Sequence, residues 1–190
     1  MNGIEIEIKL QLTEIDYSRI VDILRNSASV KAQKHQIDMY YSPAGESFYN
    51  SGDRCLRVRT EGSNTILSYK RIYDENTSTQ FIEEYETRVE SLEMVDSILK
   101  ALCFRNEITV DKHRQEFLTE DGFLVSLDRV AGLGYFMEIE NRNESDDLEK
   151  RNQDLFHFVH QLNVDITSRN TEGYSNMLFR KNSMQGEDAT

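Results

Sequence analysis

The stretch Glu5-Ile6-Glu7-Ile8-Lys9, close to the start of the chain, predicts a β-strand with two chemically different faces. Because successive side chains of a strand point to opposite sides, Glu5, Glu7 and Lys9 share one face, and Ile6 and Ile8 share the other. Two carboxylates at this spacing can hold a hard divalent cation, and the neighbouring ammonium group can bind an anionic oxygen on the same cation. Taken alone, the stretch also fits a half-buried surface strand with its charges in water.

The same spacing of charges recurs along the chain, and each segment carries mostly one sign. Basic pairs occur in LRVRT at 56–60 and DKHRQ at 111–115, and acidic pairs occur in EEYET at 83–87 and MEIE at 137–140. Two further strand-like segments carry one charged residue each at their ends: ILSYK ends in Lys70, and FLVSLD ends in Asp128. A solvated sheet face usually mixes signs to avoid repulsion between strands, so this sorting predicts a charged face built for a ligand that needs both signs.

Length and composition limit the class of protein. The chain has 190 residues, which suits one domain with an ordinary core, and a formal net charge of −12, which argues against nucleic acid as the main partner. An anionic ligand therefore needs a local cluster of basic side chains. Cys55 and Cys103, without a preceding secretory segment, predict a reduced, cytoplasmic protein without a disulfide, and no apolar run is long enough for a membrane helix.

Alternating and helical periodicities predict the order of the elements. Strand signals occur at residues 3–11, 35–41, 54–60, 65–71, 80–89, 107–117, 122–129 and 134–141, and helical signals at 13–27, 91–103 and 147–162. The predicted fold class is α+β, a closed eight-stranded antiparallel β-barrel with a charged lumen and helices packed outside. Strand 107–117 is poorly amphipathic, so we expect it at a solvated edge. Residues 1–181 form one domain in this prediction, and the polar segment 182–190 is predicted to be a disordered tail.

In their order and spacing these segments resemble the CYTH, or triphosphate tunnel metalloenzyme, superfamily. The ExExK motif at 5–9 is its hallmark, and the resemblance covers nearly the whole chain. Its further motifs are HQIDMYY at 35–41, LRVRT at 56–60, LSYK at 67–70, EEYE at 83–86, DKHR at 111–114, SLDRVAGLGYFMEIE at 126–140 and RNTEGYSNML at 169–178. The resemblance implies a tunnel that binds a linear triphosphate.

The resemblance also implies two sets of site residues. The cationic set is expected to bind the phosphates and to act in catalysis, and it consists of Lys9, Arg57, Arg59, Lys70, Lys112 and Arg114. The acidic set is expected to bind Mg²⁺ or Mn²⁺; Glu5, Glu7, Glu138 and Glu140 are its main members, and Asp128, Glu84 and Glu86 are further candidates. Phosphoryl transfer is catalysed mainly by positioning and by charge neutralisation, which agrees with such a site.

Several of these residues have a second interpretation. Glu84 and Glu86 could form ion pairs with basic residues of the tunnel in place of binding metal. Lys112 and Arg114 could be surface charges on their poorly amphipathic strand. His35 and Asp38 invite an assignment as general acid or base, but a lone histidine is more often structural, and we assign neither a catalytic role.

Three functions fit the sequence. The branch that it resembles most contains the class IV adenylyl cyclases, which convert ATP into cyclic AMP and pyrophosphate. A triphosphatase acting on thiamine triphosphate, inorganic triphosphate or a nucleoside triphosphate is the alternative, and a non-catalytic module that binds triphosphate or polyphosphate is a third. The expected partner is a small-molecule triphosphate, with no nucleic acid and no membrane, and the sequence is compatible with a homodimer.

Overall fold

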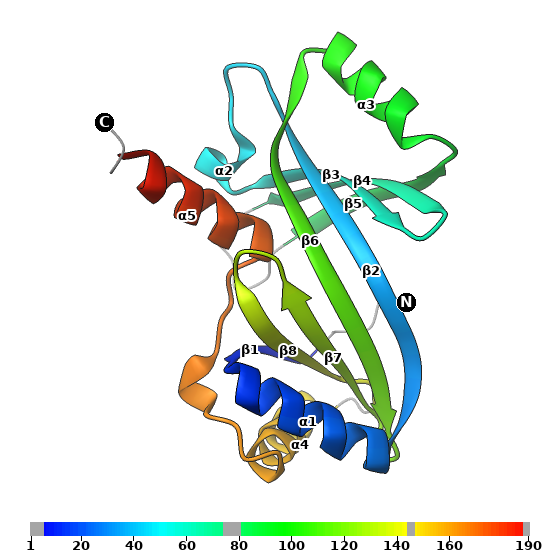
Figure 1. The fold of residues 1–190 in the computed structure, drawn as a ribbon, viewed down its shortest axis with the longest axis vertical. Helices are drawn as coiled ribbons and strands as arrows, with labels where there is room; N and C mark the ends of the chain where they lie inside the picture. Colours follow the sequence, from blue (N-terminus) through cyan, green and yellow to red (C-terminus); the bar gives the residue numbers. More distant parts are fainter. Residues whose placement is uncertain (1–5, 74–80, 144–146, 188–190) are drawn as a thin grey trace. The chain divides into compact units, whose positions relative to one another are not determined.

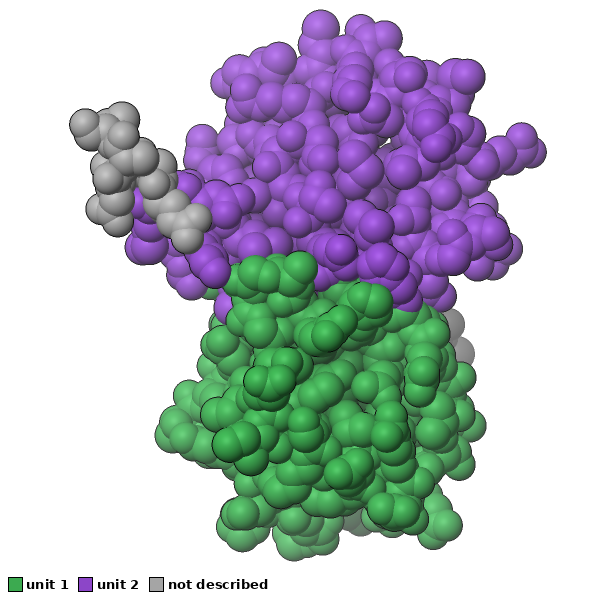
Figure 2. All heavy atoms as spheres, in the orientation of Figure 1, with its two compact units in different colours: residues 1–34, 112–172 green, residues 35–111, 173–190 purple. Residues whose placement is uncertain are grey.

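The chain is divided into two compact units, which Figure 2 shows in different colours. The structure is a computed structural model, and it describes residues 6–73, 81–143 and 147–187. Unit 1 consists of residues 1–34 and 112–172, and unit 2 consists of residues 35–111 and 173–190. Two long strands, β2 (Ala28–Pro43) and β6 (Phe104–Thr119), contribute residues to both units.

Unit 1 is built on an antiparallel sheet whose apolar face is covered by two helices (Figure 1). Besides the ends of β2 and β6, the sheet contains β1 (Glu7–Leu12), β7 (Phe123–Val130) and β8 (Gly134–Asn141). Helices α1 (Glu14–Ser27) and α4 (Leu148–Gln161) both contact β8, and a short 3₁₀ helix, η1 (Ile166–Ser168), follows α4. The Thr13 hydroxyl caps α1 by accepting a hydrogen bond from the Asp16 amide, and this fixes where the helix begins.

The core of unit 1 follows from the alternation along its strands. Its buried members are Ile8, Leu10, Leu12, Ile20, Val21, Leu24, Phe117, Phe123, Val125, Leu127, Met137, Ile139, Leu155, Phe158, Val159 and Leu162. The rings of Phe123 on β7 and Phe158 on α4 stack with centroids 4.5 Å apart. Because one face of the strands is filled by this core, the charged side chains that alternate with it lie on the other face.

Unit 2 contains the rest of the sheet and three helices. Its strands, besides parts of β2 and β6, are β3 (Arg54–Glu61), β4 (Asn64–Tyr73) and β5 (Phe81–Val89). Its helices are α2 (Phe48–Ser51), α3 (Leu92–Ala101) and α5 (Tyr174–Glu187). Tyr41, Val58 and Leu99 form the centre of its core, where α3 covers β2 and β3. None of the described helices is long and apolar enough to cross a membrane.

The strands follow the order β1-β8-β7-β6-β2-β3-β4-β5 in one antiparallel sheet. The predicted α+β class and its eight antiparallel strands are therefore confirmed, but the predicted closed barrel is wrong, because no pairing joins β1 to β5 in the described part of the chain. The outer edge of β1 is instead occupied by a later segment of unit 1. Leu10 forms an antiparallel bridge with Arg169, and the Asn170 amide donates to the Lys9 carbonyl at 2.9 Å.

The observed elements match the predicted ones except in several places. Strand 107–117 is not an edge strand, because β6 lies between β7 and β2, and the polar Gln115 on its apolar side donates to the Tyr17 hydroxyl at 3.1 Å. Strand β2 begins at Ala28, right after α1, although most of residues 28–34 are exposed and polar. Helix α2 was not predicted. Helix α5 was not predicted either, and it continues to Glu187, into the segment for which a disordered tail was predicted.

Leu155→Ala should destabilise the protein by about 2–5 kcal/mol, because the side chain is almost completely buried between α4 and the sheet and its loss leaves a cavity. Urea unfolding followed by circular dichroism measures the change. Leu148→Ala on the same helix is the control, since Leu148 is exposed, and it should cost less than about 1 kcal/mol. Equal losses for the two variants would contradict the packing described for α4.

Candidate functional site

The predicted site residues lie on the sheet faces opposite the two cores, and both units contribute to them. Unit 1 contains Glu7, Lys9, Lys112, Arg114, Asp128, Glu138 and Glu140, and unit 2 contains Arg57, Arg59, Lys70, Glu84 and Glu86. Glu5 lies outside the described residues. The charged face of each unit therefore contains members of both the cationic and the acidic set.

In unit 1 the carboxylates of β1 and β8 meet through the register of the two strands. Glu7 lies directly opposite Glu140, and Lys9 lies directly opposite Glu138. Side chains of directly opposite residues are close neighbours, with Cβ atoms about 4.5–5.5 Å apart. Three carboxylates and one ammonium group thus lie on two adjacent strands. Like charges that face each other without a cation between them are unfavourable, so this arrangement suits a divalent metal.

Arg114 connects the next two strands of unit 1. Its Nε and Nη2 donate to the two oxygens of Asp128, at 2.7 and 2.5 Å, and Nη2 also contacts the Glu138 carboxylate. Asp128 is fully buried (0% exposed), whereas Glu138 is partly exposed. Lys112, two residues before Arg114 on β6, is 4% exposed on the same face. Arg114 is therefore held by carboxylates on both β7 and β8.

The main chain after η1 holds Lys9 in place. The Lys9 ammonium group donates to the Glu172 carbonyl at 2.6 Å, and the Asn170 amide donates to the Lys9 carbonyl. Residues 169–172 thus contact both the side chain and the backbone of a member of the cationic set. This gives a structural reason for the late RNTEGYSNML motif, whose first four residues form this segment.

In unit 2 the basic residues of β3 have different partners. Arg59 donates from Nε and Nη2 to the two oxygens of Asp38, at 2.6 and 2.7 Å, and Asp38 is only 1% exposed. Arg57 lies opposite Ser68 and donates to its hydroxyl from Nε at 3.3 Å. The two neighbouring arginines thus differ: one is fixed by a buried carboxylate, and the other contacts a neutral hydroxyl.

The acidic residues of β5 lie beside the basic residues of β4. Lys70 is opposite Glu84, with 3.8 Å between the ammonium nitrogen and a carboxylate oxygen, and both side chains are nearly half exposed. Glu86 is opposite Ser68, and it is exposed. The contact of Glu84 is the ion pair that was considered as an alternative to metal binding. An exposed pair at this distance contributes little to stability, so a metal-binding role for both acids stays a prediction.

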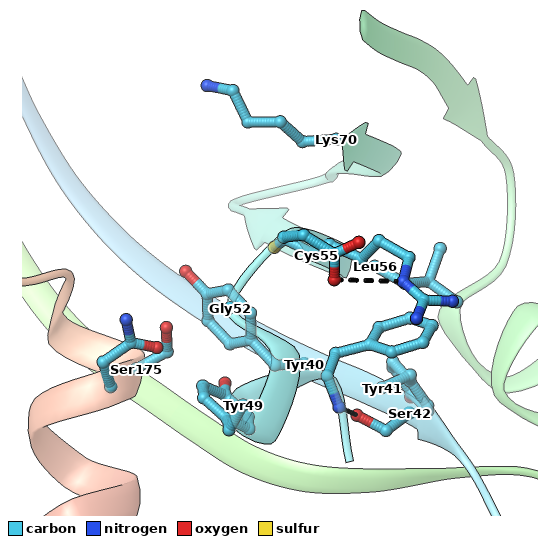
Figure 3. A pocket seen from close by; sticks show the side chains of 13 residues that line it. Tyr40, Tyr41, Ser42, Tyr49, Gly52, Cys55, Leu56, Lys70 and Ser175 are labelled. Carbon is cyan, nitrogen blue, oxygen red and sulfur yellow. Dashed lines mark hydrogen bonds and ion pairs between the residues drawn. The ribbon is translucent and has the colours of Figure 1, made fainter. Parts of the chain in front are cut away.

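A cavity of about 180 Å³ lies next to the basic residues of unit 2 (Figure 3). Side chains from β2, β3, β4, α2 and α5 surround it, including Tyr40, Tyr49, Cys55, Lys70 and Ser175. Tyr40 is directly opposite Arg57 in the β2–β3 register, so the cavity adjoins the cationic set. For scale, a dry cavity of about 150 Å³ holds benzene. A small ring system joined to a phosphate chain would match the chemistry of this lining.

Burial determines the protonation of two groups in this cavity. Burial, assisted by the charge of Asp38, raises the pKa of Tyr40 to about 12, so its phenol stays neutral and can donate a hydrogen bond at physiological pH. Burial also raises the pKa of the Cys55 thiol. A protonated thiol is a weak nucleophile, and Cys55 and Cys103 form no disulfide.

His35 and Asp38 lie in one motif but on opposite faces of β2. His35 Nε2 lies 2.7 Å from Asp111 Oδ1, and both side chains of this pair are about half exposed. Asp38 points to the charged face, where it meets Arg59. Sequence reasoning considered Asp38 without assigning it a role, and it did not single out the cavity-lining Tyr40. The i, i+2 spacing of Asp38 and Tyr40 in the HQIDMYY motif was the signal that could have found both.

Comparisons with known proteins identify the family of this chain. The CYTH domain model matches residues 3–174. A protein of Methanocaldococcus jannaschii with the name "Putative adenylate cyclase" is 29% identical over 164 residues, which cover 85% of this chain and 90% of that protein. Among solved structures, a protein from Pyrococcus horikoshii is 25% identical with a TM-score of 0.71, covering 94% of this chain and 99% of that one.

The fold also resembles that of a more distant protein from Hippeastrum. That protein is described as a putative adenylyl cyclase with a dominant triphosphatase activity; it is 18% identical with a TM-score of 0.67, covering 94% of this chain and 96% of that one. At this identity the similarity concerns the fold alone. The match to the domain model spans most of the chain and includes every predicted site residue, so this protein belongs to the CYTH domain family.

Proposed function

We propose that this protein is a divalent-metal-dependent enzyme that acts on a small-molecule triphosphate, and that its reaction is that of a class IV adenylyl cyclase. The observation that carries the proposal is the register of β1 and β8, which puts Glu7 opposite Glu140 and Lys9 opposite Glu138 on one sheet face. A binding module for anions gains nothing from carboxylates clustered on its ligand face, whereas a metal-dependent enzyme needs them.

The carboxylates of unit 1 fit a hard divalent cation. Glu7, Glu138 and Glu140 offer oxygen ligands from two adjacent strands, and none of the three is completely buried, so a partly hydrated Mg²⁺ or Mn²⁺ suits them. Glu5 would be a further ligand, because it precedes Glu7 by two residues in the ExExK motif and alternation puts both on one face. Such an ion would supply charge neutralisation on the phosphate oxygens. Asp128 fits metal binding less well, because both of its oxygens accept hydrogen bonds from Arg114.

The cationic set would bind and orient the phosphates. Unit 1 carries Lys9, Lys112 and Arg114, and unit 2 carries Arg57, Arg59 and Lys70. Guanidinium groups bind phosphate oxygens through two parallel N–H donors, and ammonium groups act as point charges. Fixing the phosphate chain in one orientation is the main task of a protein that catalyses phosphoryl transfer, because little covalent chemistry is required of its side chains.

In the cyclase reaction the ribose 3′-oxygen of ATP forms a bond to the α-phosphorus, and the bond from that phosphorus to the departing pyrophosphate breaks. The cavity beside Lys70 and Tyr40 supports a substrate with an organic group, since a bare triphosphate would leave its aromatic lining without a role. The name of the Methanocaldococcus relative points the same way. Cationic residues at the pyrophosphate end would stabilise the leaving group.

A triphosphatase is the second candidate, in which water attacks the terminal phosphorus and orthophosphate leaves. The charged faces of the two units favour it as strongly as a cyclase, because both reactions need the same metal and phosphate contacts. The size of the cavity, about 180 Å³, also suits a small ring such as that of thiamine. Which phosphorus meets the nucleophile distinguishes the two reactions.

The test is phosphorus NMR of the purified protein incubated with ATP, thiamine triphosphate or tripolyphosphate, each with Mg²⁺ or Mn²⁺. We expect cyclic AMP and pyrophosphate from ATP. Orthophosphate without a cyclic product would establish the triphosphatase instead, and the fastest substrate would identify its type. Binding that persists in chelator, with no product after metal is restored, would contradict both enzymes and leave a binding module.

Glu7→Gln should abolish most of the stabilisation that Mg²⁺ or Mn²⁺ gives to the protein, while leaving the metal-free protein equally stable or slightly more stable. Removing one charge from the Glu7–Glu140 pair relieves repulsion in the absence of the ion. Thermal unfolding with and without metal measures both effects. Glu149→Gln on α4, an exposed position, is the control with the same charge change. An unchanged metal response in Glu7→Gln would remove Glu7 from the acidic set.

Lys112→Ala should weaken binding of tripolyphosphate about 10- to 100-fold, because a hydrogen bond to a charged group is worth ~1.5–3 kcal/mol. Isothermal titration calorimetry measures the dissociation constant. Lys150→Ala removes the same charge from an exposed position of α4 and should leave the constant unchanged. If the two variants bind equally well, Lys112 is not a phosphate ligand.

A further inference from the structure

We infer that Asp38 is a positioning residue that holds the Arg59 guanidinium in the orientation in which it binds the triphosphate. This inference rests on the proposed function, and it assigns a role to the acidic residue of the HQIDMYY motif. Asp38 is neither a metal ligand nor a general base in this assignment, because it acts through Arg59.

The geometry of the pair is that of a two-point contact between flat groups. Asp38 on β2 and Arg59 on β3 are directly opposite in the strand register. Nε and Nη2 of Arg59 donate to Oδ1 and Oδ2 of Asp38 at 2.6 and 2.7 Å. Parallel N–H donors on one edge of a guanidinium fix its plane as well as its position. A single contact would leave the plane free to rotate.

Burial makes the Asp38–Arg59 ion pair costly to break. Asp38 is 1% exposed, and both of its oxygens face the same guanidinium. Each oxygen of the ionised carboxylate already accepts a donor of Arg59, and the group is buried, so it is poorly placed to ligate a metal or to take a proton from substrate. Opening a buried charge pair leaves both charges incompletely solvated, which is costly. Nε and Nη2 lie on one edge of the Arg59 guanidinium, and the remaining N–H donors of Arg59 point away from Asp38.

Unit 1 contains a second arginine–aspartate pair with the same two-point geometry. Nε and Nη2 of Arg114 donate to the two oxygens of the fully buried Asp128 at 2.7 and 2.5 Å. Arg57, the neighbour of Arg59 on the same face, donates from Nε to the neutral Ser68 hydroxyl at 3.3 Å. Within unit 2 the cationic set therefore combines one preoriented arginine with one that is held more loosely.

Asp38→Asn distinguishes a positioning role from a purely electrostatic one, because the two roles predict opposite effects on how well the protein handles the triphosphate. Removing a negative charge close to an anion-binding face would by Coulomb's law strengthen triphosphate binding. If Asp38 orients Arg59, kcat/KM should instead fall about 100-fold, the size of the loss that follows from a misplacement of about 1 Å. Asp96→Asn is the control, because Asp96 is paired with Lys100 on α3, away from the charged face, and its kcat/KM should not change.

The Arg59→Gln background shows whether Asp38 acts through Arg59. Adding Asp38→Asn to Arg59→Gln should cause no further loss of kcat/KM, because the group to be oriented is already absent. The double variant removes both charges of the pair and can be measured even if Asp38→Asn alone fails to fold. Arg59→Gln alone leaves the buried Asp38 carboxylate without its guanidinium, so circular dichroism first shows that this background is folded. Additive losses, or an equal or higher kcat/KM in Asp38→Asn, would overturn the inference.

A measurement without substrate separates this inference from the proposed function. Side-chain NMR should show the Arg59 Nε–H in slow exchange with water, identified by its disappearance in Arg59→Lys, and this protection should be lost in Asp38→Asn. If the wild type turned over no triphosphate, the proposed function would fail, while this signal would still decide whether Asp38 holds Arg59. An Arg59 Nε–H signal that is the same in Asp38→Asn and wild type would refute the assignment.

Discussion

Pairing of opposite charges between neighbouring strands is the constraint on which the polar face of this sheet depends. A face that alternates with a hydrophobic core loses much of its contact with water, and a carboxylate or guanidinium there needs a partner. Asp38 and Asp128 are almost fully buried, and each meets an arginine on the adjacent strand. Lys34 and Glu116 form a further pair in unit 1, at 3.1 Å. Glu7 lies opposite a like charge, Glu140, which also pairs with Arg142 at 3.1 Å.

The hydrophobic cores fix the strand register in which these charged side chains pair. In unit 1, Leu10, Leu127, Met137 and Ile139 have no exposed surface, and their burial under α1 and α4 determines which side of each strand faces the helices. A shift of one residue in any strand pairing would exchange the apolar and charged faces, so it would expose the core and bury the acids. The energy of burying the apolar side chains therefore also fixes the alignment of the ionic side chains. Stability and function depend on the same register.

Much of the fold could be predicted from the sequence, because alternation with a period of two is strong wherever one strand face is buried. All eight predicted strands and all three predicted helices are present, most of them with boundaries close to those expected. The start of β2 could not be predicted, since residues such as Val30 and Lys31 are exposed and carry no periodic signal. The open sheet could not be predicted either. Which segment pairs with the outer edge of β1 depends on contacts between parts far apart in the chain, here those of Arg169 and Asn170.

For the candidate site, the charged face of each unit could be predicted from spacing, but the partner of each charge could not. The i, i+2 rule assigns Arg57 and Arg59 to one face and says nothing about which of them faces a carboxylate. That depends on the strand register, which pairs Asp38 with Arg59 and Ser68 with Arg57. The cavity of unit 2 could not be predicted from the sequence either. Helix α5 contributes Ser175 and Asn176 to it, and the only signal in that segment was a family motif.

The segment 169–172 has a consequence for the behaviour of the protein at high concentration. An uncovered strand at the end of a sheet can add strands from other molecules, and this is a common start of aggregation. At β1, residues Arg169 and Asn170 occupy the backbone groups that such a strand would use. At the other end, β5 exposes Glu84, Glu86 and Arg88, whose charges oppose the approach of a second copy. The two ends of one sheet are thus protected by different means, one by backbone pairing and the other by charge, so loss of the segment after η1 would leave the backbone edge of β1 open to self-association.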